Sequence, residues 1–416
     1  MILAQLKTKR ISAEQFFMLS VMIVNGGNYL YNLLLGRILG PVQFSDAAIL
    51  ITLLLVLSFV AMTFQLTVTK FAVNYSEQGE QDFLNSMKRK ALVISLILGG
   101  LIAAFSPQLQ QIFNTNSKSM FILFALGIPV YFLMSINRGF YQGHKDFIKL
   151  SISYQSEMLS RLLLTLLFLL LLSTNTSALV AVGILFSLFF GLIPFKKTGL
   201  TFRSKLKLDV AERKQINRFI LITAFYEMTQ IIINNSDILL VKHYFDAYEA
   251  GLFASLALIG RVVYFIAWMF VMILLPTVVE KSKNGENTLP VFFKYLSYVV
   301  LLATVIVLST MTFPELIVIL MFGSAYLEIA PILWQYAIAT AIFAISNVFV
   351  YYFLSLEKYW PVVISGVFGM AQIGLIVFFH NSLAQVVHVQ ILAMVALLLI
   401  QVAFFIYQHK INIHRR

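Results

Sequence analysis

The sequence contains no cysteine, which excludes disulfide bonds, thiolate metal ligands and a cysteine nucleophile. Its six histidines are scattered without the spacing of a metal site, so we expect no bound metal. The G-x-x-x-x-G-K-[ST] pattern of an ATP-binding loop is also missing, so this chain is not expected to use ATP by itself. We predict neither a cofactor nor a catalytic residue.

Charge is scarce as well. Charged residues make up 12% of the 416 residues, whereas a soluble protein keeps roughly a quarter of its residues charged. Hydrophobic residues make up 60%. So few charges cannot cover the surface of a water-soluble globule of this size, and most of the chain must lie in lipid. This excludes a cytosolic enzyme, a secreted disulfide scaffold and a disordered chain.

Apolar segments of about 20 residues, the length that crosses a bilayer as a helix, recur along the whole chain. We count twelve of them, separated by polar or Pro- and Gly-containing breaks. They run near residues 14–39, 44–69, 89–106, 119–141, 148–172, 176–195, 216–242, 250–279, 290–313, 329–355, 360–380 and 384–407. The pattern predicts an all-α, polytopic membrane protein with about twelve transmembrane helices.

The net charge of +12 is typical of a nucleic-acid-binding protein or of a membrane protein with basic cytoplasmic loops. If the N-terminus lies in the cytoplasm and twelve spans alternate, 25 of the 30 Lys and Arg residues fall on the cytoplasmic side. Arg37, Lys118 and Lys242 then fall outside, and Arg161 and Arg261 fall within spans. This bias predicts that both termini are cytoplasmic, and it explains the charge without nucleic acid.

One long polar connection, residues 196–215, separates an N-terminal half (1–195) from a C-terminal half (216–416), each with six predicted spans. The first and seventh spans end alike, with a basic residue and a short loop, at an offset near 206 residues. Equal, weakly similar halves predict two pseudo-symmetric six-helix bundles around a central cavity. No polar stretch is long enough for a catalytic domain, so we do not expect an enzyme.

Ionisable residues inside predicted spans are costly and are therefore candidates for function. Glu157 and Arg161 lie four residues apart in the fifth span, on one helix face and within reach of an ion pair. Two interpretations stay open. The pair can lock this helix to its neighbours, or it can line the cavity, where the forked guanidinium of Arg161 would attract a pyrophosphate.

Further charged candidates lie in the seventh, eighth and first spans. Asp237 follows the polar stretch 234–236 and is either part of a solvated helix end or an ion-coupling group. Glu227 is the candidate for proton coupling, because burial favours the protonated form of a carboxyl group. Arg261 lies about two to three turns into the eighth span, too deep to reach the surface, and Arg37 ends the first span. We predict that both arginines are unpaired and face the cavity.

Amide and glycine residues form two further patterns. Asn25, Asn28 and Asn32 recur at i, i+3 and i+7 in the first span and would bind sugar hydroxyls in the cavity or bond to neighbouring helices. Gly36-x-x-x-Gly40 and Gly139-x-x-x-Gly143 lie at predicted helix ends. There we expect the glycines to let the chain turn rather than to dimerise helices.

Three stretches resemble a known family of membrane proteins. The run Arg138-Gly139-Phe140-Tyr141-Gln142-Gly143, followed by Phe147, Glu157 and Arg161, resembles the RG-x-x-QG…F…E-x-x-x-R pattern of bacterial polysaccharide transporters. Residues 237–253 resemble their junction between helices seven and eight, and residues 322–326 resemble their FG-x-x-Y loop. Ser45 stands where the family usually has glycine. The chain therefore resembles members of the multidrug/oligosaccharidyl-lipid/polysaccharide exporter superfamily over most of its length.

The resemblance implies a flippase that carries an undecaprenyl-pyrophosphate-linked oligosaccharide across the bacterial inner membrane by alternating access, for O-antigen, capsule or similar polysaccharides. It also implies a monomer in membrane lipid, with the glycosyltransferases and polymerase of the pathway as partners. In the related lipid II flippases an Asp at the place of Asp237 contributes to a sodium site. Its partner oxygens come from helix eleven, where this sequence offers only Ser365 and Gln372, so we do not expect a sodium site.

Two alternatives to the flippase stay open. The first is a cation-coupled drug or metabolite antiporter of the same superfamily, whose cavity should be acidic and aromatic. The second is a membrane glycosyltransferase or polymerase. The second is disfavoured because such enzymes usually need a sizeable external loop that bears catalytic residues, and every external connection here is short.

Overall fold

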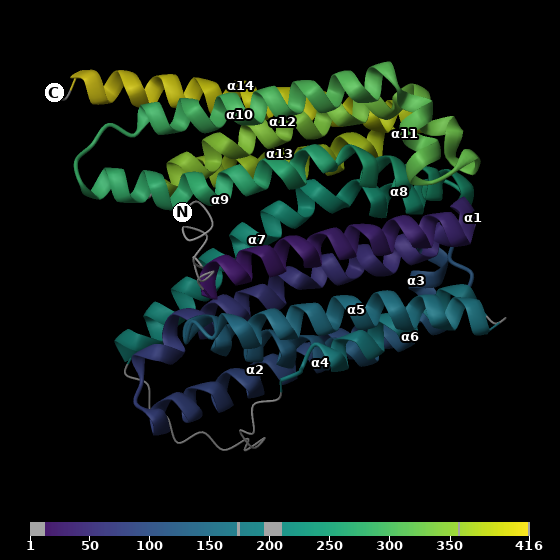
Figure 1. Cartoon of the computed structure of the whole chain (residues 1–416), viewed down its shortest axis with the longest axis horizontal. Coiled ribbons are helices and arrows are strands. Elements are labelled where there is room, and N and C mark those ends of the chain that lie inside the picture. The colour runs from purple at the N-terminus through teal and green to yellow at the C-terminus, as the bar shows by residue number, and fades with distance from the viewer. Residues whose placement is uncertain (1–12, 173–174, 195–209, 357, 415–416) are drawn as a thin grey trace, which may run out of the picture. The chain divides into compact units, whose positions relative to one another are not determined.

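A computed structural model describes residues 13–172, 175–194, 210–356 and 358–414, and these are helical almost throughout (Figure 1). Two short 3₁₀ turns at Ala72–Asn74 and Ser324–Ile329 accompany the α-helices. The helices are α1 (Ala13–Phe71), α2 (Glu77–Ala104), α3 (Ser106–Ile112), α4 (Ser119–Gly143), α5 (Phe147–Leu171), α6 (Thr176–Phe190), α7 (Val210–Tyr244), α8 (Ala247–Gly260), α9 (Val262–Lys283), α10 (Leu289–Thr312), α11 (Pro314–Met321), α12 (Ala330–Ser355), α13 (Trp360–Phe378) and α14 (Leu383–His414).

The helices confirm the predicted multi-pass, all-α architecture. Among the described residues, nine helical runs are long and apolar enough to cross a membrane, and the α2–α3 pair, bent by 64°, would make a tenth. Each of the twelve predicted segments falls on a helix. The first two share α1, and the sixth is α6, which is only 15 residues long. The eighth is divided at Arg261 into α8 and α9.

The kink inside α1 follows from two residue types. Gly40 has a φ of 67°, a conformation that glycine adopts without a steric penalty. Pro41 follows it and has no backbone N–H to continue the helical hydrogen bonds. The break therefore separates the first two predicted spans at the place where the sequence analysis put their boundary.

Contacts between residues divide the chain into two compact units, which we call unit 1 and unit 2. Unit 1 comprises residues 1–35 and 57–227, and unit 2 comprises residues 36–56 and 228–416. In unit 1, α4 packs against α2, α5 and α6 (Figure 1). In unit 2, α12 packs against α8, α9, α10, α13 and α14. The predicted boundary at residues 196–215 lies largely outside the described residues, as does the basic N-terminal tail.

The turn between α4 and α5 shows how local chemistry starts a helix. Asp146 is the N-cap of α5, and its carboxylate accepts hydrogen bonds from the Lys149 backbone N–H at 3.2 Å and from Lys149 Nζ at 2.5 Å. Partial burial alone would raise the pKa of Asp146, but these two donors outweigh it and lower that pKa. The cap therefore stays ionised at neutral pH and favours the helix N-terminus.

Glycines allow α4 to approach the end of α1 within unit 1. A Cβ atom on Gly139 would lie 2.4 Å from the Gln65 carbonyl oxygen, and one on Gly143 would lie 2.8 Å from the Thr69 carbonyl oxygen. Thr69 also donates to the Gly139 carbonyl at 3.2 Å. Gly139 and Gly143 therefore form a packing surface for α1 within the chain, a role that was not predicted from the sequence.

Replacing Gly139 with alanine should destabilise unit 1. The new methyl group would overlap the α1 backbone, and overpacking of this kind typically costs about 1–3 kcal/mol. Gly100→Ala in α2 is the matched control, because no atom lies within 4 Å of its added Cβ and alanine favours a helix more than glycine does. We expect Gly139→Ala to lower the melting temperature of the protein in detergent and Gly100→Ala to leave it unchanged or slightly raised. Equal melting of the two variants would contradict this packing.

Candidate functional site

Seven charged side chains are buried within the described part of the chain. They comprise four cations and three carboxylates: Arg138, Arg161, Lys242, Arg261, Asp46, Glu157 and Asp237. Unpaired charge is very costly in lipid or in a protein interior, so each should have partners. The geometry of these partners decides what each group can do.

In unit 1 a single carboxylate serves two arginines. Glu157 Oε2 accepts a hydrogen bond from Arg138 Nη2 at 2.7 Å, and Glu157 Oε1 accepts one from Arg161 Nη2. The predicted Glu157–Arg161 ion pair is confirmed, because residues four apart on a helix share one face. The cluster carries one cation more than it has carboxylates.

The two arginines of this cluster are held differently. Arg138 donates to Ser153 Oγ at 2.9 Å and to the Ser153 carbonyl at 3.1 Å, and its guanidinium lies 3.9 Å from the Tyr154 ring centre. Arg161 makes longer contacts, 3.4 Å to Ser187 Oγ and 3.5 Å to Asn28 Oδ1. Arg138 is therefore a positioning residue, whereas Arg161 retains donors that a stronger acceptor would take.

Arg138 was missed as a site residue. Arg138 is one of the 25 basic residues placed on the cytoplasmic side, as part of the connection after the fourth span, and its place in that connection is wrong because Arg138 is buried within α4. The RG-x-x-QG pattern was the available signal, since it places the arginine beside the glycines that pack on α1. A count of loop charges treats such an arginine as exposed.

The three amides of the first span do not act as one group. Asn28 accepts the hydrogen bond from Arg161 Nη1, and Asn32 Nδ2 donates to the Asn28 carbonyl of its own helix at 2.8 Å. Asn25 is exposed in the described structure. The structure therefore brings only Asn28 to the arginine cluster, and the sugar-binding role of the three amides stays a prediction.

Unit 2 holds a second charged cluster around Asp237. Arg261 Nη2 donates to Asp237 Oδ1 at 2.7 Å, and the Tyr336 hydroxyl donates to Asp237 Oδ2 at 2.7 Å. Arg261 Nε donates to the same hydroxyl at 3.2 Å, which closes a ring of three side chains. The expectation that Arg261 is unpaired is wrong. Asp237 lies 24 residues away on α7, and helix periodicity does not reveal such a partner.

Two other basic residues also have partners within unit 2. Lys242 Nζ contacts Asp46 Oδ1 at 3.0 Å and donates to Ser45 Oγ at 2.6 Å, so this lysine is buried and paired, and the side of the membrane assigned to it stays a prediction. Arg37 is exposed, but it donates to the carbonyl oxygens of Met321 and Ile319 at 2.8 and 3.1 Å. It also donates to Leu320, and it thereby caps the end of α11. Arg37 is therefore not an unpaired cation either.

Glu227 lies half-buried on α7, at the last position of unit 1. No hydrogen bond or ion pair to its carboxylate is found among the described residues. Its predicted role in proton coupling stays a prediction, and the geometry leaves the carboxylate available for it.

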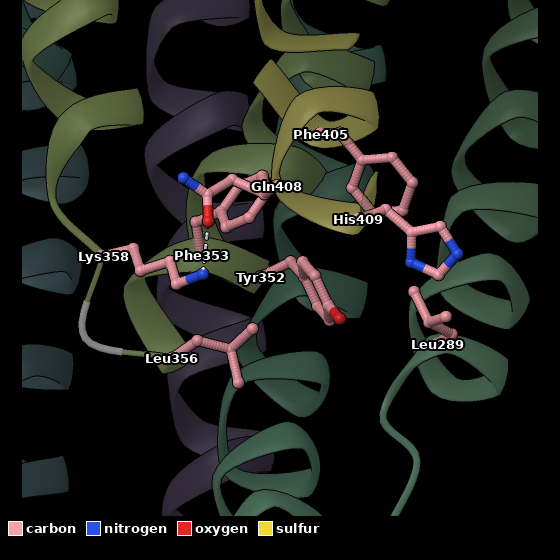
Figure 2. Close-up of a pocket in the computed structure, with 8 residues that line it drawn as sticks. All are labelled: Leu289, Tyr352, Phe353, Leu356, Lys358, Phe405, Gln408 and His409. Carbon is pink, nitrogen blue, oxygen red and sulfur yellow. Dashed lines mark hydrogen bonds between the residues drawn. The ribbon is translucent and has the colours of Figure 1, made fainter. Parts of the chain in front are cut away.

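Two small cavities lie within unit 2. One, of about 30 Å³, is bordered by Asp237, Arg261, Tyr336 and Gln390. Figure 2 shows the other, of about 40 Å³, where Lys358 Nζ donates to Gln408 Oε1 at 2.6 Å and aromatic rings form part of the lining. Neither has room for a sugar, and among the described residues no cluster of His, Asp or Glu has the composition of a metal site.

The double variant Glu157→Arg/Arg161→Glu exchanges the two charges of this pair. It should be as unstable as Glu157→Arg alone or Arg161→Glu alone. In the exchanged variant Arg138 would face a new arginine at position 157 instead of a carboxylate. Breaking a buried ion pair typically costs about 3–5 kcal/mol, which lowers the melting temperature in detergent. Adding Arg138→Met to the exchanged variant should raise its melting temperature, because this change removes the repulsion. If the exchanged variant had the same melting temperature as the wild type, Glu157 would not bridge the two arginines.

Comparison with solved structures supports a transporter fold. An inward-facing MATE family multidrug transporter of the MOP superfamily matches with a TM-score of 0.75 and 12% identity, over 92% of this chain and 95% of the other. The lipid II flippase MurJ, in an inward closed conformation, matches with a TM-score of 0.75 and 14% identity, over 95% of this chain and 87% of the other. A MOP superfamily transporter from Pyrococcus furiosus, described as having a binding pocket of reversed polarity, matches with a TM-score of 0.55 and 14% identity, over 95% and 97%.

Sequence comparison gives the family. No curated protein matches the chain in sequence. The sequence profile of the family described as polysaccharide biosynthesis protein matches residues 34–331, which include all seven buried charged residues of the described chain. This chain has the fold of the MOP superfamily transporters and belongs to the polysaccharide biosynthesis protein family.

Proposed function

We propose that this protein is a flippase that moves an undecaprenyl-pyrophosphate-linked oligosaccharide from the inner to the outer leaflet of the bacterial cytoplasmic membrane. The glycosyltransferases and polymerase of the same surface polysaccharide pathway would be its partners. The observation that carries the proposal is the buried excess of positive charge in unit 1, where Arg138 and Arg161 share the single carboxylate of Glu157.

The excess cation suits a pyrophosphate better than a neutral or cationic substrate. A guanidinium binds phosphate oxygens through two parallel N–H donors, and the interaction strengthens where water is excluded. Arg161 has the longer and weaker protein contacts, so phosphate oxygens could replace the hydroxyl of Ser187 and the amide of Asn28 at little cost. Glu157 would then keep the guanidinium of Arg161 oriented, because Arg138 binds the other oxygen of the Glu157 carboxylate and holds it in place.

Two compact units support a mechanism of alternating access. Each unit has its own packed core. In unit 1 the core forms around α4, and in unit 2 it forms around α12. Each unit could therefore move as a rigid body. The lipid tail of the substrate would remain in the bilayer while the charged head group crosses inside the protein. Movement of whole units would spare the helices from exposing backbone polar groups to lipid.

A drug or metabolite antiporter of the same superfamily is the alternative. A cavity for cationic substrates should hold carboxylates that lack a basic partner. The buried carboxylates of the described residues, Asp46, Glu157 and Asp237, each have a basic partner at hydrogen-bond distance. Glu227 is only partly buried and has no basic partner among the described residues, and a coupling proton would suit either transporter.

Replacing Arg161 with alanine, which introduces no new charge and leaves Glu157 paired with Arg138, should stop transport without preventing folding. Arg161→Ala removes the excess cation and keeps the Arg138–Glu157 pair, so we expect correct insertion but loss of lipid-linked oligosaccharide from the outer leaflet. Arg161→Lys should restore part of the transport, because a single ammonium cannot form the forked contact. Arg89→Ala, which removes an equal charge from an exposed site on α2, is the control and should transport normally. The measurement is a leaflet-resolved assay of lipid-linked oligosaccharide in a deletion strain.

Two results would reject the flippase. Normal outer-leaflet delivery in the deletion strain would show that another protein moves the lipid. If the same strain instead accumulates cationic dyes, and re-expression restores their efflux, the protein is an antiporter.

The proposed orientation places both termini in the cytoplasm, and a chain without native cysteine allows a direct test. A cysteine at Lys118, in the connection between α3 and α4, should react with an impermeant thiol reagent in intact cells. A cysteine at Asn284, between α9 and α10, should react only after permeabilisation. Both side chains are exposed, so access to the reagent depends on the side of the membrane alone. The reverse labelling would overturn the assigned orientation.

A further inference from the structure

The carboxylate of Asp237 is fully engaged by groups that belong to the protein. Oδ1 accepts hydrogen bonds from Arg261 Nη2 and from the Ile238 backbone N–H, at 2.7 and 2.8 Å. Oδ2 accepts one from the Tyr336 hydroxyl at 2.7 Å. A cation that entered this site would have to displace the guanidinium, because both oxygens already carry strong donors.

The backbone around Arg261 is arranged to hold the guanidinium in place. Arg261 lies at the break between α8 and α9, and Thr340 Oγ1 donates to the Gly260 carbonyl there at 2.8 Å. Gly260 lies against Tyr336, and a Cβ at Gly260 would come within 2.3 Å of the Tyr336 ring. Phe253 contacts the same ring edge to face. The position of the cation is therefore fixed by three helices, α7, α8 and α12.

The space beside Asp237 and Arg261 is too small to hold a second cation with its ligands. The adjoining cavity has a volume of about 30 Å³, which is enough for one water molecule. The buried Gln390 Oε1 borders this cavity and has no hydrogen-bond partner among the described residues, so it would accept from such a water. The centre is electrically neutral as it stands, and no further cation is needed to stabilise the carboxylate.

We propose that Arg261 is a built-in counter-cation for Asp237, occupying the place that an exchangeable monovalent cation would otherwise take. The sodium ion that the resemblance to lipid II flippases implies does not fit these residues, because the guanidinium already satisfies the carboxylate. Asp237 is therefore not an ion-coupling group in this protein. The proposal concerns cation binding by unit 2 and holds whatever the transported substrate is.

The same geometry predicts a latent cation site. Removing the Arg261 side chain would leave a buried carboxylate beside an enlarged cavity, with oxygens from Tyr336, Thr340 and Gln390 close by. Carboxylate, hydroxyl and amide oxygens are suitable ligands for a small hard cation, and the vacated volume has the shape of a guanidinium. Arg261→Ala should therefore gain a dependence on cations that the wild-type protein lacks.

The test uses the purified full-length protein in detergent and measures its melting temperature in sodium, potassium and choline chloride at equal ionic strength. The wild type should melt at the same temperature in all three salts. Arg261→Ala should melt lower than wild type in choline and should gain several degrees from sodium or from low millimolar guanidinium. The double variant Asp237→Asn/Arg261→Ala, which has neither charge, should show no cation-specific change.

Two results would overturn the proposal. One is a sodium-specific rise in the melting of the wild type that Asp237→Asn abolishes, because Asp237 would then bind an exchangeable ion. The other is an identical cation response of Arg261→Ala and the double variant. If Arg261→Ala cannot be purified, the wild type and the neutral double variant still test the proposal. The proposal requires that the melting temperature of each is the same in all three salts. No transport is measured, so failure here is distinct from failure of the flippase assignment.

Discussion

The cost of charge in a low-dielectric interior is the constraint on which this structure depends. A chain in which charged residues make up only 12% can keep an ion inside a membrane-spanning helix only where a partner meets it. Each buried ion pair therefore joins positions that must stay together. Asp46 and Lys242 lie 196 residues apart in sequence, and their contact joins residues 36–56, in the middle of α1, to the rest of unit 2. Ser45 supports the same lysine, in the place where related transporters usually have glycine.

The two units satisfy this constraint in different ways. In unit 2 each buried cation has its own carboxylate, as Lys242 has Asp46 and Arg261 has Asp237. In unit 1 two arginines share one carboxylate, and the surplus charge is tolerated through serine, asparagine and aromatic contacts. A surplus is a cost to folding, because neutral clusters stabilise the buried state better. Its retention in unit 1 is the reason for placing substrate phosphate there and not at Arg261.

The sequence predicted the helices well because hydrophobic length is a local property. Each of the twelve apolar segments falls on a helix, and the Glu157–Arg161 pair followed from the spacing of four residues. The partners that join different helices were not predictable in this way. Three ion pairs depend on which helices pack together: Arg138 with Glu157, Asp237 with Arg261, and Asp46 with Lys242. The periodicity of one helix does not indicate which helix packs against it. For this reason Arg261 and Arg37 were expected to be unpaired, and no partner was expected for Lys242.

Helix breaks and polar side chains also depend on one another. A break leaves backbone carbonyls without partners, and in lipid these must be satisfied by the protein itself. Tyr326 donates to the Gly36 carbonyl at 2.7 Å close to the kink in α1, and Thr340 donates to the Gly260 carbonyl at the break before α9. Arg37 does the same for the end of α11. Three polar residues of unit 2, Tyr326, Thr340 and Arg37, therefore complete the backbone where helices are interrupted. Arg161 differs, because it lies in the uninterrupted helix α5 and completes no break. A charge that the backbone does not require is the one most readily assigned to a substrate.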